Sequence, residues 1–327
     1  QQKVVVSTQV TRYGGADTCA YELHRYLLAN DSMSICIFFD SSKVTKDKYN
    51  PDNLPNVYYH SMPKNVNDVA DHEYNLDNLS IGNADVYAFN YLAPVIAKHI
   101  FPKATVHYMI TGCPYINNKN LLTSTNLLQK QIPLLWPKDP EATTVRVVDK
   151  IIPNTWLSKN IFEHIYRRRI EDPIDLHEIF NVNIPSDDRS IDILFVCSDI
   201  TRKVKGIDFV VDIFSNKLMS KYRKVIVGKN KEKVVGLMNT EVPGLVSKED
   251  VMKLMSQSKI VIIPSYIESY SITAIEAVQA GCIVLTSHNT ACASFFPSFF
   301  VVNDYDTTNW VHKLKYILNN YSYFSQI

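Results

Sequence analysis

Residues 264–281 read PSYIESYSITAIEAVQAG and directly follow the apolar run 260–263. The run predicts a buried strand and the next segment predicts a helix, with Glu268 before the helix and Glu276 on it. In an open parallel sheet, ligands bind where a strand ends and a helix begins. We therefore expect the amides of 269–272 to face an anion such as a pyrophosphate, and the two carboxylates to hold sugar and ribose hydroxyls.

The same order of strand and helix extends from this stretch along the chain. Apolar runs predict strands in the first half at 3–7, 34–40, 56–59, 84–89, 104–110 and 150–153, and in the second half at 191–197, 222–227, 260–263 and 283–286. Apolar strands that alternate with helices are typical of parallel sheets covered on both faces. The fold class is therefore α/β, with two Rossmann-like domains.

The length of the chain sets the number of domains. With 327 residues, the chain exceeds the roughly 100–200 residues of a usual single core. Residues 181–190 read NVNIPSDDRS, the polar, proline-containing composition of a linker between domains. We predict an N-terminal domain at 1–183, a C-terminal domain at 184–327, and a cleft between them.

Composition excludes several classes of function. The formal net charge of +1 gives no field that favours nucleic acid or an anionic membrane. An apolar run long enough to span a bilayer and a secretory leader are both missing, although peripheral contact with a membrane stays open. The six cysteines contain no C-x-x-C pair, so we expect buried free thiols and a reducing, cytoplasmic compartment.

Glycine is scarce, with nine residues in the chain, so each position is informative. Five of them fall at predicted junctions of strand and helix: Gly14, Gly15, Gly206, Gly228 and Gly281. The adjacent Gly14 and Gly15 follow the first strand, where backbone amides can approach an anion at a helix N-terminus. The sequence there is neither G-x-G-x-x-G nor a P-loop, which disfavours dehydrogenases and P-loop enzymes.

Two glutamates eight residues apart are, by themselves, more often a solvated helix face than a site. Here a strand precedes them, a helix start lies between them, and the sequence AVQAG follows the second. This segment resembles the E-x7-E signature of retaining glycosyltransferases of the GT-B fold, particularly glycosyltransferase family 4. Members of that family typically have Phe and Gly where this chain has Tyr270 and Ser271. Lys205-Gly206 and Gly14-Gly15 resemble further elements of the family.

The resemblance implies a role for each of these residues. Glu268 would contact the donor sugar, Glu276 the ribose, and Lys205 the diphosphate, where a cation offsets the charge that develops on the leaving nucleotide. The turn 243–246 resembles the place where the family packs the nucleotide base, although a plain surface turn is nearly as good an interpretation. The donor-binding residues implied are Gly14, Gly15, Ser269, Tyr270, Ser271, Ile272, Glu276, Leu245 and Val246.

The sequence departs from the family at three places. The family commonly has an Arg shortly before the Lys, where this chain has Asp199 and Ile200, so we expect Arg202 to substitute as a catalytic cation. Alone, the run 202–205 would be a solvated basic loop. The family's N-terminal His is replaced by residue 110 or 111, which leaves His107 as a secondary candidate, although a His inside an apolar strand is more often a core residue. The loop 287–291 reads SHNTA where the family has Gly-Gly and a Glu.

We expect a retaining, metal-independent glycosyltransferase that needs no cofactor and takes a nucleotide-sugar donor and a glycan or other hydroxyl acceptor. No metal-binding pattern appears in the sequence. Without an obvious covalent nucleophile, a same-face displacement fits better than a two-carboxylate scheme. The alternatives are a nucleotide-sugar epimerase on the same fold, and a catalytically silent relative that binds a nucleotide or a partner protein.

Overall fold

The computed structural model describes residues 2–8, 15–30, 33–40, 50, 52–64, 66–74, 76, 79, 81–90, 92–111, 140–173 and 189–326. These residues form two compact units, an N-terminal unit up to residue 173 and a C-terminal unit from residue 189. The predicted domain boundary at 183/184 lies outside the described residues, and so do Gly14 and Cys113.

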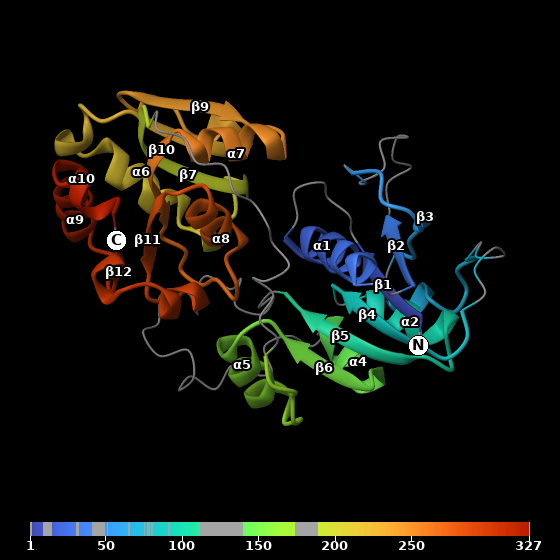
Figure 1. Cartoon of the computed structure of the whole chain (residues 1–327). Helices are drawn as coiled ribbons and strands as arrows, with labels where there is room; N and C mark the ends of the chain where they lie inside the picture. The colour runs from blue at the N-terminus through green and yellow to red at the C-terminus, as the bar shows by residue number, and fades with distance from the viewer. Residues whose placement is uncertain are drawn as a thin grey trace. The chain divides into compact units, whose positions relative to one another are not determined.

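The N-terminal unit is built on one parallel sheet in the order β3-β2-β1-β4-β5-β6. Its strands are β1 (Gln2–Thr8), β2 (Ser34–Asp40), β3 (Val57–Ser61), β4 (Ala84–Phe89), β5 (Thr105–Ile110) and β6 (Lys150–Pro153). The helices are α1 (Gly15–Ala29), α2 (Ala93–Ile100), α4 (Pro140–Val147) and α5 (Trp156–Tyr166). Because β1 leads to β2 on one side and β4 leads to β5 on the other, the strand order reverses between β1 and β4 (Figure 1).

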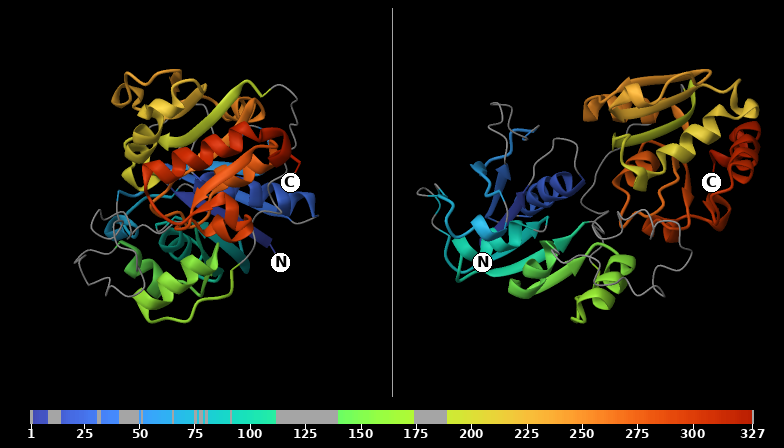
Figure 2. Two further views of the ribbon diagram at one scale, coloured as in Figure 1. Left: turned by 90° about the vertical axis from the view of Figure 1, so that its left-hand side faces the viewer. Right: turned by 180° about the vertical axis from the view of Figure 1, so that it is seen from behind.

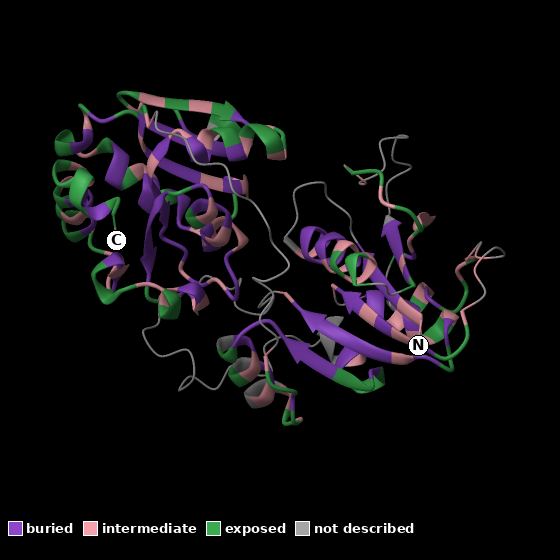
Figure 3. Cartoon of the chain, in the orientation of Figure 1, coloured by how far each residue is buried: buried purple, intermediate pink, exposed green. Residues whose placement is uncertain are grey.

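The core of this unit follows from the apolar strands. Val4, Val86 and Val106 are fully buried in one cluster, together with Ile96 and Ala97 of α2. A central strand of a parallel sheet is covered on both faces, so it can carry apolar residues at successive positions. Figure 3 shows this as strands that are mostly buried beneath helices with exposed outer sides.

The C-terminal unit repeats the architecture with a parallel sheet in the order β12-β11-β10-β7-β8-β9. Its strands are β7 (Ile191–Asp199), β8 (Lys224–Lys229), β9 (Thr240–Gly244), β10 (Ser258–Ile263), β11 (Ile283–Ser287) and β12 (Val301–Val302). The helices are α6 (Ile207–Ser215), α7 (Lys248–Ser256), α8 (Ile272–Gln279), α9 (Thr307–Asn319) and α10 (Tyr321–Phe324). The strand order reverses between β7 and β10.

Helices cover both faces of this sheet (Figures 1 and 2). On one face, Phe209 of α6 and Trp310 of α9 belong to a single apolar cluster with Ile262. On the other face, Met255 of α7 and Ala277 of α8 pack in a second cluster with the alternate residues of the strands. The sheet is therefore the middle of three layers, and its carboxyl edge is the place where loops from both faces meet.

All ten strands predicted from the apolar runs are present, with ends that agree or differ by at most two residues. Two short strands, β9 and β12, were not predicted. The interpretation of 243–246 as a plain turn was wrong in part, because Pro243 and Gly244 end β9. A proline is tolerated there because β9 is an edge strand.

The predicted free thiols are confirmed for the five cysteines that the structure describes. Cys19, Cys36, Cys197, Cys282 and Cys292 are all buried and free. Burial raises the pKa of Cys197 to about 12 and that of Cys282 to about 11.

Candidate functional site

The carboxyl ends of β7 and β10 form the reversal point of the C-terminal sheet, where open α/β sheets bind ligands. Two segments extend from this point, the 3-10 turn Lys203–Lys205 after β7 and the loop 264–271 after β10. They are joined by a hydrogen bond from the Tyr266 amide to the Val204 carbonyl at 2.9 Å. The predicted motif residues therefore come together from positions some sixty residues apart in the sequence.

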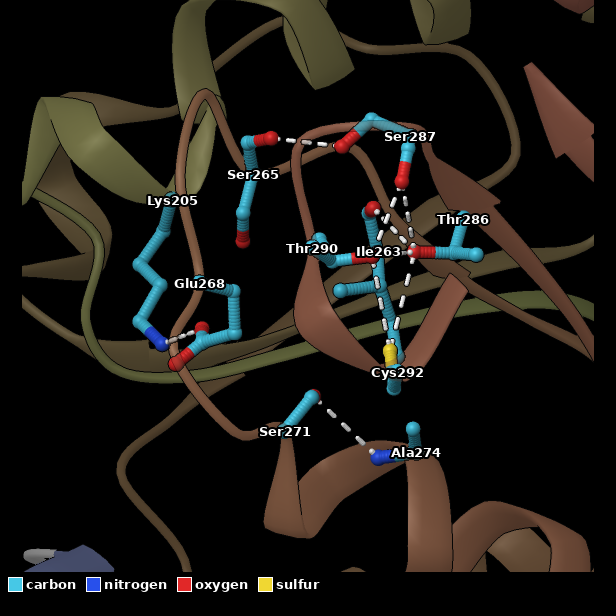
Figure 4. A network of polar contacts seen from close by, with 10 residues as sticks. All are labelled: Lys205, Ile263, Ser265, Glu268, Ser271, Ala274, Thr286, Ser287, Thr290 and Cys292. Atoms are coloured by element: carbon cyan, nitrogen blue, oxygen red, sulfur yellow. Dashed lines mark hydrogen bonds and ion pairs between the residues drawn. The ribbon is translucent and has the colours of Figure 1, made fainter. Parts of the chain in front are cut away.

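Lys205 and Glu268 form an ion pair between Nζ and Oε2. Their side chains are 24% and 16% exposed, so the pair is shielded on most sides and still open to an incoming ligand. Figure 4 shows the two side chains pointing toward each other from the two segments. An unpaired charge at this depth would be costly, so each group holds the other in a fixed position.

Gly206 explains how the two segments approach so closely. Its φ is +75°, a left-handed value that favours glycine, and a Cβ built there would lie 2.3 Å from the Pro264 carbonyl oxygen. No side chain fits in that space. The Lys-Gly element is therefore a packing requirement, because the missing Cβ lets the Lys205 turn lie against the end of β10.

The α8 N-terminus lies beside the ion pair. Ser271 is its N-cap, and the side chain accepts a hydrogen bond from the Ala274 amide at 3.3 Å. Ser269 and Tyr270 are buried and Ile272 is half-buried, so this segment can offer a ligand its backbone rather than its side chains. The first-turn amides of a helix have no partner within the helix, which suits them to bind an anion.

Glu276 lies one turn further along α8, and its side chain is 11% exposed. Its Oε1 is 3.5 Å from Nζ of Lys248, the first residue of α7. Burial raises the pKa of the Glu276 carboxyl, and the Lys248 ammonium opposes that rise. The predicted base-packing residues Leu245 and Val246 lie just before Lys248 in the chain, and Leu245 is 38% exposed.

The predicted substitute cation, Arg202, is exposed and begins the 3-10 turn that carries Lys205. Asp199 faces a different set of groups. Its Oδ1 accepts hydrogen bonds from the Thr201 hydroxyl at 2.6 Å and the Asn230 amide at 2.8 Å, and Lys229 Nζ is 3.2 Å from Oδ2. These hydrogen bonds, first of all those from Thr201, hold the pKa of Asp199 well below its usual range. No pattern in the sequence predicted this cluster.

His107 is a core residue, as the more common interpretation of an apolar-strand histidine would have it. Its ring stacks on Tyr87 at 5.0 Å and its Nε2 is 3.5 Å from Asp85, which also binds Lys3. Burial lowers the pKa of His107. Lys3 and Asp85 are the second residues of β1 and β4, toward the edge of the sheet opposite to the one where ligands bind in such sheets.

Gly15 begins α1 in the N-terminal unit, whereas Lys205, Glu268 and Glu276 belong to the C-terminal unit. Of the predicted residues in the second half, the structure brings Lys205 and Glu268 into contact, whereas Glu276 contacts Lys248. Among the described residues, no group of three or more His, Cys, Asp or Glu side chains could hold a metal ion. No described helix is long and apolar enough to cross a bilayer.

Residues 190–320 match the model of the family described as glycosyl transferases group 1. The match covers the whole C-terminal sheet and all three motif residues of the site. The chain is a glycosyltransferase. No curated protein matches its sequence.

Solved structures similar to this glycosyltransferase share its fold at low sequence identity. WaaG, a glycosyltransferase involved in lipopolysaccharide biosynthesis, has 15% identity and a TM-score of 0.61 over 97% of this chain and 90% of that chain. Sucrose-phosphate synthase from Thermosynechococcus elongatus has 14% identity and a TM-score of 0.69 over 98% and 90%. An alpha-glucosyltransferase in complex with UDP and a 13-mer DNA has 12% identity and a TM-score of 0.63 over 99% and 92%. The two Rossmann-like units are therefore those of the GT-B fold.

Proposed function

We propose that this glycosyltransferase is a retaining, metal-independent enzyme of family 4 that transfers a sugar from a nucleotide-sugar donor to an acceptor hydroxyl, in glycan or glycoconjugate synthesis. The observation that carries the proposal is the Lys205–Glu268 ion pair at the reversal point of the C-terminal sheet, beside the N-terminus of α8. The UDP-bound alpha-glucosyltransferase of the same fold supports a nucleotide as part of the donor.

Each part of the site matches one part of a nucleotide sugar. The N-terminus of α8 and the Lys205 ammonium suit the diphosphate, because a helix N-terminus and an ammonium group both carry positive charge. Glu268 accepts hydrogen bonds from sugar hydroxyls, while Glu276 accepts them from the ribose. The apolar side chains of Leu245 and Val246 pack on the base.

In the reaction, the bond between the anomeric carbon and the phosphate oxygen breaks, and the acceptor oxygen bonds to the same face of that carbon. The acceptor proton passes to the departing phosphate oxygen, and a nucleoside diphosphate leaves. Lys205 offsets the negative charge that grows on this leaving group, with Arg202 as a second, solvated cation. Fixed charges of this kind stabilise a transition state because they need no rearrangement as the reaction proceeds.

The first experiment is a thermal-shift screen over UDP-, GDP- and ADP-sugars. A donor at about 100 times its dissociation constant stabilises the fold by roughly 2.7 kcal/mol, which gives a clear rise in Tm. Absence of a shift with every donor would count against the proposal. The product of the active donor, analysed by NMR, shows whether the anomeric configuration is retained, and unchanged activity in EDTA is expected of a metal-independent enzyme.

The motif residues are tested with the donor that the screen selects. Glu268→Gln and Lys205→Met should each lower kcat by about 10²–10³-fold, the loss typical for one fixed group that stabilises developing charge. Lys203→Met is the matched control, because Lys203 lies on the same turn but is exposed, and it should stay within about twofold of the wild type. Turnover of donor without any acceptor would favour an epimerase, and full activity of Glu268→Gln would refute the assigned roles.

We also propose a cytoplasmic location and no nucleic-acid partner. Free buried thiols suit a reducing compartment, and the net charge of +1 provides no field for a polyanion. Fractionation of the native host tests both the cytoplasmic location and the lack of a nucleic-acid partner. Recovery of the chain in an oxidising compartment would contradict the cytoplasmic location.

A further inference from the structure

The backbone of Glu268 is held by the loop that follows β11. Its amide donates to the Asn289 carbonyl at 3.2 Å, and its carbonyl accepts from the Ala291 amide at 2.8 Å. These two bonds flank Thr290, which forms an isolated parallel bridge with Glu268. The position of residue 290 therefore fixes the backbone from which the Glu268 side chain extends.

Thr290 is itself fixed by a buried set of hydroxyls. It is 3% exposed, and its Oγ1 donates to the Ser287 carbonyl at 2.8 Å. Because a hydroxyl has one proton, Thr286 is the donor in the 2.7 Å contact between the two Oγ1 atoms. The Cys292 thiol donates to Thr290 Oγ1 at 3.4 Å. Figure 4 shows these side chains gathered to one side of Glu268.

This set of hydroxyls is tied back to the end of β10. Ser287 Oγ donates to the Ser265 carbonyl at 2.6 Å, two residues after β10 ends. The loop after β11 and the loop that carries Glu268 are thus linked through side chains as well as backbone. A buried network in which every hydroxyl has a partner is rigid, since any movement would leave a polar atom unsatisfied.

We propose that Thr290 is a positioning residue, whose buried hydroxyl fixes the backbone of Glu268 and so keeps the Glu268 carboxylate at the donor sugar. The inference rests on the proposed role of Glu268. Thr290 is too buried to touch a ligand itself, so it acts through the two backbone bonds on either side of it. Its loop is also one of the three places where this sequence departs from the pattern of the family that it resembles.

The test compares Thr290→Val with Thr290→Ser. Valine keeps the shape of threonine and removes the hydroxyl, whereas serine keeps the hydroxyl. A misplacement of about 1 Å can cost about a hundredfold in rate, so Thr290→Val should lower kcat by about ten- to a hundredfold. The dissociation constant for the free nucleoside diphosphate should change by less than about twofold, because the diphosphate is assigned to Lys205 and α8. Thr290→Ser should recover most of the lost kcat.

Ser258→Ala is the matched control. Ser258 is also fully buried, and its hydroxyl donates to the Leu254 carbonyl at 2.6 Å, but it lies at the amino end of β10. It loses a comparable buried hydrogen bond without touching the loop, so its kcat should stay at the wild-type value. Were Thr290→Val too unstable to purify, Thr286→Val, which removes the donor to Thr290, should show the same loss of kcat with nucleotide binding kept.

The outcomes separate this inference from the proposed function. If Glu268→Gln is inactive while Thr290→Val keeps wild-type kcat, the positioning role is wrong and the site stands. Equal loss in Thr290→Val and Thr290→Ser would also overturn it, because the hydroxyl would then not be the cause. If Glu268→Gln is fully active, the assigned role of Glu268 fails, and the positioning role fails with it.

Discussion

Replacing Gly206 with alanine tests whether the close approach of the Lys205 turn to β10 is required. The added Cβ would lie 2.3 Å from the Pro264 carbonyl oxygen and 3.1 Å from its carbonyl carbon. The backbone has to open by about 0.7 Å before that first contact reaches 3.0 Å, a distance below which Cβ atoms are essentially never found. Pro264 begins the loop to Glu268, so the opening also moves the ion pair.

Two costs add in this variant, and a third effect reduces them. A non-glycine residue in the left-handed region costs roughly 1–2 kcal/mol, and forcing atoms into a packed site typically costs about 1–3 kcal/mol. Alanine returns about 0.4–1 kcal/mol by restricting the unfolded chain. Together these ranges give an expected loss of about 1–5 kcal/mol of unfolding free energy for the C-terminal unit.

Gly236 offers the matched control. It has a similar φ of +74°, yet an added Cβ meets no atom within 4 Å. Gly236→Ala should cost about 1 kcal/mol, the conformational cost alone. The difference between the two variants then isolates the steric contact with Pro264.

The assay is urea unfolding followed by the fluorescence of Trp310, which is fully buried in the C-terminal core, with Trp136 and Trp156 replaced by phenylalanine. The midpoint reports stability as long as the urea dependence of the unfolding free energy is unchanged. A Gly206→Ala variant as stable as Gly236→Ala would refute the steric argument. If Gly206→Ala also had normal activity, glycine at residue 206 would not be required for the geometry of the Lys205–Glu268 ion pair.

Two further predictions concern pH. Burial raises the pKa of Glu276, so the folded state binds the proton more tightly and loses stability as the pH rises from about 4.3 through the raised value. Glu276→Gln should therefore have a higher Tm than the wild type at pH 8, and this difference in Tm should close toward pH 4. A difference that does not change with pH would contradict this. Hydrogen bonds lower the pKa of Asp199, so its stabilisation is present above the unfolded value of about 3.9 and is lost as pH falls below it. Asp199→Asn should lower the Tm at pH 7 by about 2–4 °C, the shift that about 1 kcal/mol gives in a domain of this size, and the difference should shrink as the pH falls below about 3.9; differential scanning calorimetry measures both effects.

The sequence predicted those parts of the fold whose signal is local. Each of the ten predicted strands is a run of apolar residues that a doubly covered sheet can bury. Strand β9 was missed because its sequence, TEVPG, is half exposed and contains a proline. Strand β12 has only two residues, and its pairing with Thr286 and Ser287 defines it rather than any pattern of its own.

The site was predicted to the extent that its residues lie in one motif. The pattern of a helix start and a glycine turn indicated Lys205, Glu268 and Glu276 as candidates, and the structure brings Lys205 into contact with Glu268. The residues that contact Glu276 and Glu268, Lys248 and Thr290, belong to no such pattern. Lys248 meets Glu276 through the packing of α7 on α8, and Thr290 meets Glu268 through a loop that reads as an ordinary polar segment.

The buried thiols allow the opening of each unit to be measured separately. Cys36 lies in the N-terminal sheet and Cys282 in the C-terminal unit, and burial raises the pKa of both. Only the thiolate reacts with an alkylating agent, so each thiol is labelled only after its own surroundings open and let it ionise. The rate of labelling at Cys36 therefore reports the opening of the N-terminal unit, and the rate at Cys282 reports that of the C-terminal unit. Mass spectrometry can measure both rates on the same native chain.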